Sequence, residues 1–452
     1  MKIQNWTYSK LIGYVFPSIL SILFVSLYTI VDGLFISRYV GTAALAAVNI
    51  VYPIYNFAFG ISIMICVGGS VLVAISLGAK QYKTANNDFS LVNLVMLIVS
   101  LATTLAGLIY INPLLNLLGL TDQLMGHGKI YAQLLLISMP FLTVKIGFEY
   151  FLRVDHNATL SFIVTLSGGI INIVLDYLFV AVFNWGVTGA GLATLSGIII
   201  SSIMGLYYFI KYAKHLKFIL PKWRWKVLLL VCKNGLSELV TEASAGVVVI
   251  LFNYKLIEYA GTSSVAAYTT LLYIFYVFKS ISMGITIGTQ PIISFNLGLK
   301  SYKTIKDLFL KSTVFIGSIS LIVFMIMQIH GEFLIKIFIT NDHHTTQLAL
   351  NGLTIYSFSL LFSGLNIFGI GYLNAVNDGK KAVLISFAKP LCFMIPTLYL
   401  LSDVFGLDGI WMTVPAAEVC TFLLILSFLI KDNILTDQLY DYKQYVSLEN
   451  AI

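Results

Sequence analysis

Charged residues are scarce in this sequence. The 452 residues are 10% charged and 58% hydrophobic, whereas a soluble protein of ordinary composition carries roughly 25% charged residues. This deficit excludes a soluble globular protein. It indicates an integral membrane protein, whose backbone must satisfy its hydrogen bonds internally as helices or as a closed barrel.

Cysteines and catalytic motifs are also few. The four cysteines, Cys66, Cys232, Cys392 and Cys420, show no CxxC spacing, which argues against a zinc site or a disulfide framework. The sequence holds no GxxxxGK[ST] phosphate loop, no HExxH and no GxSxG, the motifs of many ATP-driven and hydrolytic proteins. We therefore expect neither an enzyme nor a cofactor.

Apolar runs of about 20 residues recur without the ten-residue alternation of barrel strands, so the expected fold is all-α. The first run is too long for a signal-peptide core and is interpreted as a retained helix. We predict twelve transmembrane spans, over residues 11–36, 44–75, 90–111, 129–151, 160–182, 189–210, 236–257, 265–297, 310–330, 349–373, 382–401 and 409–430.

Positive charges gather in one of the two alternating sets of connecting segments. The poorer set holds mainly Arg38, Lys129 and Lys336. The richer set is Lys80, Lys83, Arg153, Lys211, Lys214, Lys217, Lys222, Arg224, Lys226, Lys300, Lys303, Lys306, Lys311, Lys380 and Lys381. The positive-inside rule makes the richer set cytoplasmic, and an even number of spans then places both termini on the cytoplasmic side of the cell membrane. The net charge of +7 thus reflects topology, and we expect no nucleic-acid partner.

The two halves of the sequence repeat each other. YVGTAALAAV (39–48) aligns with YAGTSSVAAY (259–268), and LGAKQYKT (77–84) with LGLKSYKT (297–304), in one constant register and without a gap. Six spans per half make these parallel repeats about an axis along the membrane normal, with a substrate path expected between them. The predicted domains are an N-terminal bundle over 1–215, a basic linker over 216–230 and a C-terminal bundle over 231–452.

The basic segment that joins the halves is YFIKYAKHLKFILPKWRWK (208–226). We interpret it as a solvated connector that touches anionic lipid headgroups, and a regulatory lipid site is the alternative.

Five stretches, in this order on two six-helix halves, resemble the multidrug and toxic compound extrusion (MATE) family of antiporters, with the bacterial MepA-like and DinF-like branches most similar. They are VDGLFISRYVGTAALAAVNI (31–50), FLRVDHNATL (151–160), INIVLDYLFV (171–180), GVTGAGLAT (186–194) and IGTQPIISFNLGLKSYKT (287–304). The resemblance implies a V-shaped pair of bundles that alternates between outward- and inward-facing states. It also implies export of organic compounds in exchange for H⁺ or Na⁺.

Asp32 is an acid inside an apolar run, which costs roughly 2.5–3.5 kcal/mol on insertion scales, so such acids usually face a cavity or a partner. Asn172 and Asp176 are four residues apart and share one helix face. The resemblance implies that these three residues, with Thr194 and Tyr28, form a coupling-ion cluster. Carboxylate pairs suit a proton and their oxygens suit Na⁺, so both ions stay open, as does a purely structural role for the acid.

Other polar residues of the predicted spans lie outside this cluster. Glu149 stands where many relatives are expected to have asparagine, and it is a candidate substrate or secondary proton site together with Arg153; an intrahelical pair of the two is the alternative. Glu242 is a further candidate of this kind, while an interfacial role is favoured for Glu238. Pro17 matches the proline at which family members are proposed to bend, with a static kink as the alternative.

Buried Glu418 is expected to pair structurally, with Lys145, Lys279 and Lys389 as candidate partners or as snorkelling side chains. Aromatic side chains such as Tyr52 and Tyr55 are candidates for lining the cleft, because aromatic faces hold organic cations.

Three functions remain open at this point. The first is a secondary antiporter of cationic or amphipathic compounds that acts as a monomer among membrane lipids. The second is a flippase for lipid-linked or polysaccharide precursors. An intramembrane enzyme is the third, although the sequence offers no nucleophile or metal set for it.

Overall fold

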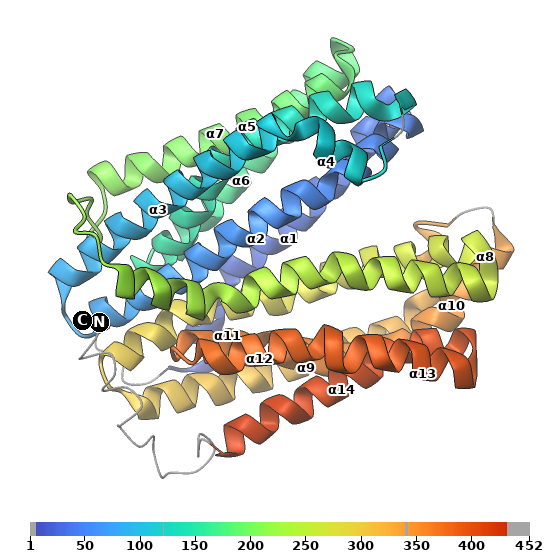
Figure 1. Cartoon of the computed structure of the whole chain (residues 1–452). Helices are drawn as coiled ribbons and strands as arrows, with labels where there is room; N and C mark the ends of the chain where they lie inside the picture. The colour runs from blue at the N-terminus through green and yellow to red at the C-terminus, as the bar shows by residue number, and fades with distance from the viewer. Residues whose placement is uncertain (1–5, 121, 340–341, 432–452) are drawn as a thin grey trace. The chain divides into compact units, whose positions relative to one another are not determined.

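A computed structural model describes residues 6–120, 122–339 and 342–431, and this part of the chain contains helices and no strand. The long helices run side by side in bundles (Figure 1). In chain order the elements are α1 (Tyr8–Phe35), the π-helical segment η1 (Ile36–Val40), α2 (Thr42–Gly78), α3 (Tyr82–Ile109), α4 (Ile111–Leu117), α5 (Asp122–Val154), α6 (Ala158–Asp176), the π-helical η2 (Tyr177–Val182), α7 (Gly186–Lys211), α8 (Trp225–Gly298), α9 (Tyr302–Lys336), α10 (His343–Tyr356), the 3₁₀ turn η3 (Ser357–Ser359), α11 (Leu360–Ala375), α12 (Gly379–Ala388), the π-helical η4 (Lys389–Met394), α13 (Ile395–Phe405) and α14 (Leu407–Lys431).

The described residues contain eleven helices that are long and apolar enough to cross a membrane. One of them, α8, has non-helical dihedral angles at Ala260 and Gly261. The hydroxyl of Ser264 donates to the carbonyl oxygen of Leu256 at 2.8 Å, a contact that requires the chain to reverse between them. Because α8 therefore contains two of the predicted spans, the eleven helices account for all twelve, and the predicted all-α membrane fold is confirmed.

The backbone repeats as the sequence does. Gly186 and Gly406 occupy matched positions of the two repeats and have φ angles of 59° and 61°. Lys80 and Lys300, a second matched pair, have φ angles of 61° and 57°. A lysine in this left-handed region is uncommon, so its occurrence at both matched turns shows that the two halves share one local geometry.

The chain groups into two compact units whose boundaries run through α1 and α8. We call Leu20–Glu242 the first bundle. The second bundle combines the start of α1, up to Ile19, with the chain from Ala243 onward. These units follow packing, whereas the predicted domains follow the order of the repeats along the chain.

Glycines explain why the two helix starts pack where they do. In the second bundle, a methyl group added at Gly284 would overlap the backbone of Ile19 in α1. In the first bundle, a methyl group at Gly68 would overlap the carbonyl of Val231 at the start of α8. Each repeat therefore begins its first helix against the second helix of the other repeat, at a contact that only a residue without a side chain permits.

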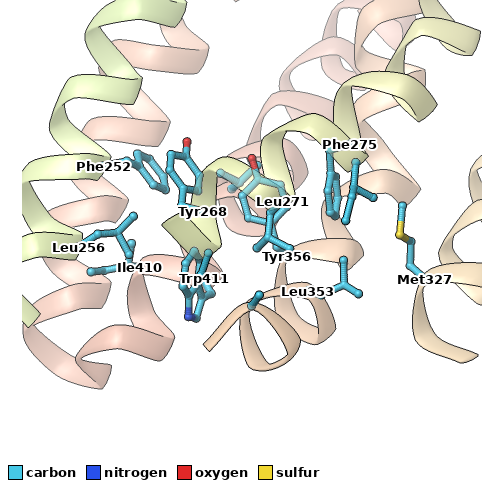
Figure 2. Packing of buried hydrophobic residues seen from close by; sticks show 14 of the residues in the cluster. Phe252, Leu256, Tyr268, Leu271, Phe275, Met327, Leu353, Tyr356, Ile410 and Trp411 are labelled. Atoms are coloured by element: carbon cyan, nitrogen blue, oxygen red, sulfur yellow. The ribbon is translucent and has the colours of Figure 1, made fainter. Parts of the chain in front are cut away.

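The core of the second bundle is an aromatic cluster on α8, α10 and α14 (Figure 2). Tyr268 stacks on Phe252 with ring centroids 5.2 Å apart, and Phe275 meets Tyr356 edge to face at 4.6 Å. Trp411 is fully buried beside them. Such ring pairs add specific geometry to apolar burial, and they join the two halves of α8 to the helices around them.

The segment between the repeats, residues 212–224, is fastened to the first bundle; we call it the strap. The buried carboxylate of Asp155, just after α5, accepts from the hydroxyl of Tyr208 at 2.7 Å. It also accepts from the backbone N–H groups of Lys214, His215 and Leu216 at 3.2, 3.0 and 3.3 Å. The side chains of the strap are mostly exposed, as expected of a solvated connector, but its backbone is anchored.

The start of α3 holds the far end of the strap. Asn87 accepts from the N–H of Lys222 at 2.7 Å, and Ser90 accepts from the N–H of Ile219 at 3.0 Å. Arg224 pairs with Asp88 at 3.2 Å. The connector is therefore a part of the first bundle's surface with fixed hydrogen bonds.

We expect Asp155→Ala to destabilise the protein by about 3 kcal/mol, because it leaves a tyrosine hydroxyl and three strap amides without their charged acceptor. Trypsin should then cut the strap at Lys214 and Lys217 faster than in the parent protein. Asp408→Ala, which removes an exposed aspartate, is the control. Equal cleavage rates in both variants would contradict this anchoring role.

His156 predicts a stability loss in mild acid. Burial lowers its pKa, and the nearby His215 lowers that pKa further, while Asp155 opposes the shift. The unfolded chain therefore takes up this proton at a higher pH than the folded protein, so stability falls as pH drops below about 6.5. His156→Asn suits the φ angle of 63° and should flatten the fall in Tm between about pH 7.5 and about pH 5.5. An unchanged pH profile would show that His156 does not contribute.

Candidate functional site

Two acids of the first bundle meet where α1 and α6 give way to π-helical turns. Asp32 lies one turn before η1, and Asp176 is the residue immediately before η2. The two π-helical segments pack against each other, and the two carboxyl groups interact with each other as a buried pair. The structure thus brings together the two acids that the resemblance expects to converge. Single π-helical turns are rare and often mark functional sites.

Asn172 and Thr194 complete the predicted set. Asn172, one turn before Asp176, donates from Nδ2 to Thr194 Oγ1 at 3.3 Å. Four buried oxygens here have no hydrogen-bond partner: Asp32 Oδ1, Asn172 Oδ1 and both carboxyl oxygens of Asp176. Buried acceptors are almost always satisfied, so this group of bare oxygens is suited to a proton or a small cation.

Tyr28 is one turn before Asp32 and lines the contact between α1 and α6. A methyl group added at Gly169 of α6 would lie 2.8 Å from the Tyr28 ring and would overlap the ring of Phe24. The close approach of α1 to α6 therefore depends on this glycine. It holds Tyr28, and with it the following turn that carries Asp32, next to the helix of Asp176.

Tyr131 is a neighbour that the sequence analysis missed. It lies in α5, is 3% exposed, and interacts electrostatically with Asp32, Asp176, Tyr52 and Tyr55. The rings of Tyr52 and Tyr55, expected to be cleft aromatics, are 5.3 Å apart. One tyrosine in an apolar helix gives no signal in the sequence, because its proximity to the acids depends on how α5 packs against the helices that carry them.

Glu149 belongs to a second polar group in the same bundle. Its Oε1 accepts from Thr165 Oγ1 at 2.8 Å and lies 3.5 Å from the ammonium of Lys145. Arg153, only 2% exposed, donates to the backbone carbonyl of Glu149 at 3.0 Å. The intrahelical ion pair of Glu149 is therefore made with Lys145, and Arg153 binds the carbonyl at the end of α5.

The remaining predicted residues lie near the boundaries of the two bundles. Glu242 is the last residue of the first bundle, where it packs beside Gly60 of α2. Glu238 lies one turn earlier and interacts electrostatically with Tyr150. Pro17 lies inside α1, which continues as a helix through it, in the part that belongs to the second bundle.

Glu418 is buried in the second bundle and is fully paired. Its Oε1 is 2.7 Å from the ammonium of Lys389, and its Oε2 accepts from Asn366 Nδ2 at 2.7 Å. The same amide nitrogen lies 2.8 Å from the carbonyl oxygen of Glu418. Structural pairing of this acid is thus confirmed, with Lys389 as its partner among the three candidate lysines.

A permanently bound metal ion would need a cluster of ligating side chains. Within residues 6–120, 122–339 and 342–431 no group of three or more His, Cys, Asp or Glu side chains could hold a metal ion. The Asp32 cluster offers two carboxylates, an amide oxygen and a hydroxyl. Those are hard oxygen donors suited to Na⁺, and the ion would be cargo passing through the protein.

Twelve apolar spans in two parallel repeats, with a buried acidic cluster inside one bundle, define a membrane transporter of the repeat-built class. The family is more specific. A model of the family described as MatE matches residues 17–178 and 238–400, well over half of the chain, so the chain belongs to the MATE family, whose members are transporters and not enzymes.

Curated relatives extend over nearly the whole chain. The multidrug export protein MepA of Staphylococcus saprophyticus is 24% identical over 428 residues, covering 93% of this chain and 94% of the relative. MepA of Staphylococcus aureus is 23% identical over 436 residues and covers 95% of each chain.

Solved structures show the same fold. A multidrug resistance MATE transporter of the MOP superfamily, in an outward-facing conformation, superposes with a TM-score of 0.89 at 20% identity, covering 96% of this chain and 98% of that one. A MOP superfamily transporter from Pyrococcus furiosus superposes with a TM-score of 0.87 at 20% identity, covering 95% and 97%.

We expect Gly197→Ala to destabilise the protein by about 1–3 kcal/mol through overpacking. The added methyl group would lie 2.5 Å from the carbonyl oxygen of Gly168 and 3.3 Å from Cβ of Asn172, so α6 and α7 must separate and the bond from Asn172 to Thr194 must lengthen. Thermal unfolding in detergent measures the loss.

Gly317→Ala is the matched control, since a methyl group there meets nothing within 4 Å. It should raise stability by about 0.5–1 kcal/mol, as alanine is the better helix former. Similar shifts of one sign in both variants would show that the α6–α7 contact is not close-packed.

Proposed function

We propose that this chain is a secondary active antiporter that exports organic compounds, cationic or amphipathic, in exchange for H⁺ or Na⁺. The observation that supports it most is the interaction between Asp32 and Asp176, which have three buried carboxyl oxygens without a hydrogen-bond partner beside the equally bare Asn172 Oδ1. Two negative charges at contact in a site away from water repel strongly. The pair therefore needs a proton or a cation, and binding either one changes the forces between α1 and α6.

The exchange cycle follows because the carboxyl pair needs a bound ion. With the ion bound, the carboxyl pair is neutralised and α1 packs closely on α6 at Gly169. Once the ion leaves, Asp32 and Asp176 repel each other again. Pro17, where a backbone hydrogen bond is missing, is the proposed point at which α1 bends when Asp32 is protonated. Thr194 and Asn172 supply neutral oxygens for Na⁺, and Tyr28 packs α1 against α6 next to the acids.

Aromatic and charged side chains are the proposed contacts for the organic substrate. Tyr52 and Tyr55 present paired aromatic surface near Tyr131, and aromatic faces attract organic cations. Glu149 and Glu242 are proposed as substrate contacts or as secondary proton sites. Arg153, bound to the carbonyl of Glu149, positions that acid.

The export direction comes from the names of the relatives, which are multidrug export proteins. We place the protein in the cell membrane with both termini cytoplasmic, following the distribution of positive charge. It works as a monomer surrounded by lipid, with small organic molecules and H⁺ or Na⁺ as its partners.

Removing either acid should uncouple transport. Asp32→Asn and Asp176→Asn each remove one of the two charges that bind the coupling ion. We expect ion-driven dye efflux from reconstituted vesicles to fall about tenfold or more, since a loss of about 1.4 kcal/mol in ion binding is already tenfold. Imposing the Na⁺ gradient and the pH gradient separately identifies the coupling ion.

Asp408→Asn, an exposed aspartate in the first turn of α14, is the control and should leave efflux unchanged. Parental efflux in both Asp32→Asn and Asp176→Asn would rule out this coupling site. Efflux that responds to neither gradient in the parent protein would rule out antiport.

A further inference from the structure

Asp32 and Asp176 of the first bundle and Glu418 of the second bundle have different partners, although both bundles are built on one repeat. In the first bundle Glu149 is paired with Lys145, but Asp32 and Asp176 have three buried carboxyl oxygens without a hydrogen-bond partner. In the second repeat the positions matched to Asp32, Asn172, Asp176 and Thr194 hold Phe252, Cys392, Pro396 and Val414. None of these side chains is an oxygen ligand, so the second repeat has no copy of the coupling cluster.

A different charged group lies close to that place. Lys389 is about one turn before Cys392, the counterpart of Asn172, and Glu418 is one turn after Val414, the counterpart of Thr194. Both are displaced toward the same end of their bundle, because their two helices run in opposite directions. Lys389 and Glu418 therefore lie on the two helices that match those of Asn172 and Thr194. On these helices they are one turn away from the positions that correspond to the ion cluster.

We propose that Lys389 is a built-in substitute for the transported cation: its ammonium neutralises Glu418 permanently, so the second bundle takes up no coupling ion and exchange draws on the first bundle alone. The inference rests on the proposed antiport function and specifies which half of the protein supplies the coupling.

The contacts of Glu418 support a closed site. One carboxyl oxygen takes the ammonium at 2.7 Å and the other takes the Asn366 amide at 2.7 Å, and the Glu418 side chain is only 4% exposed. The paired residues come from α11, from the start of η4 and from α14. With one oxygen on the ammonium and the other on the amide, the charge of Glu418 is neutralised by the protein itself, without H⁺ or Na⁺.

The experiment compares Lys389→Met, Glu418→Gln and the double variant that carries both changes. The double variant removes both charges together, so it keeps the net charge of the site while removing the acid. We expect it to exchange the same number of ions per substrate as the parent in reconstituted vesicles, with an unchanged dependence on Na⁺ and pH.

Lys389→Met alone leaves a buried carboxylate without its cation. Its Tm in detergent should rise when Na⁺ replaces choline, or when the pH is lowered, by more than the Tm of the parent does. This additional rise should be on the order of 2 °C and should vanish in the double variant. If Lys389→Met does not fold, the double variant and Lys389→Arg, which keeps the charge and should behave as the parent, decide the question.

A double variant that exchanges one ion fewer per substrate, or whose Na⁺ or pH dependence shifts tenfold, overturns the inference, because Glu418 would then be a coupling group. Lys389→Met without any additional response to cations also counts against it. Asp32→Asn separates the two proposals: if that variant keeps ion-driven exchange, the proposed function itself fails. If Asp32→Asn abolishes exchange and the double variant alters it, only the present inference fails.

Discussion

A carboxylate taken out of water needs a positive partner, because an unpaired buried charge is among the most costly groups a protein can hold. The second bundle meets this need within itself, through the ammonium of Lys389 and the amide of Asn366 on Glu418. In the first bundle Asp32 and Asp176 face each other with bare oxygens. In the second bundle the protein itself neutralises the buried carboxylate. In the first bundle the carboxyl pair requires a proton or a cation from outside the protein.

Close contact between helices allows a change of charge at the acids to act on helix positions. Gly169 lets α1 approach α6, and Gly197 lets α6 approach α7, so the helices that carry the acids are closely packed against their neighbours. Closely packed interiors transmit small displacements instead of absorbing them. In the proposed function, a change of charge between Asp32 and Asp176 would act on α1 and α6, and the π-helical turns that follow both acids are the least regular part of those helices.

Composition and periodicity were enough for the twelve spans and the repeat, because hydropathy and the constant register between the halves are properties of the linear sequence. The pairing of Asp32 with Asp176 followed from resemblance, and that of Glu418 with Lys389 was one of three open choices. Other features depend on tertiary packing that no local pattern reports. These include Tyr131 beside the acids, the ion pair of Glu149 with Lys145, and the strap anchored on Asp155. Residues 432–452, in the predicted C-terminal domain, lie outside the described residues.

The crossed packing of the two helix starts has a consequence for biosynthesis. A ribosome delivers the chain from its N-terminus, yet the beginning of α1 packs against Gly284, which is synthesised only after the whole of the first bundle. The first bundle in turn lacks its last packing partner until the start of α8, with Val231, has entered the membrane. The first bundle can therefore pack as soon as the start of α8 has been inserted, whereas the start of α1, up to Ile19, must wait for the second bundle to be synthesised.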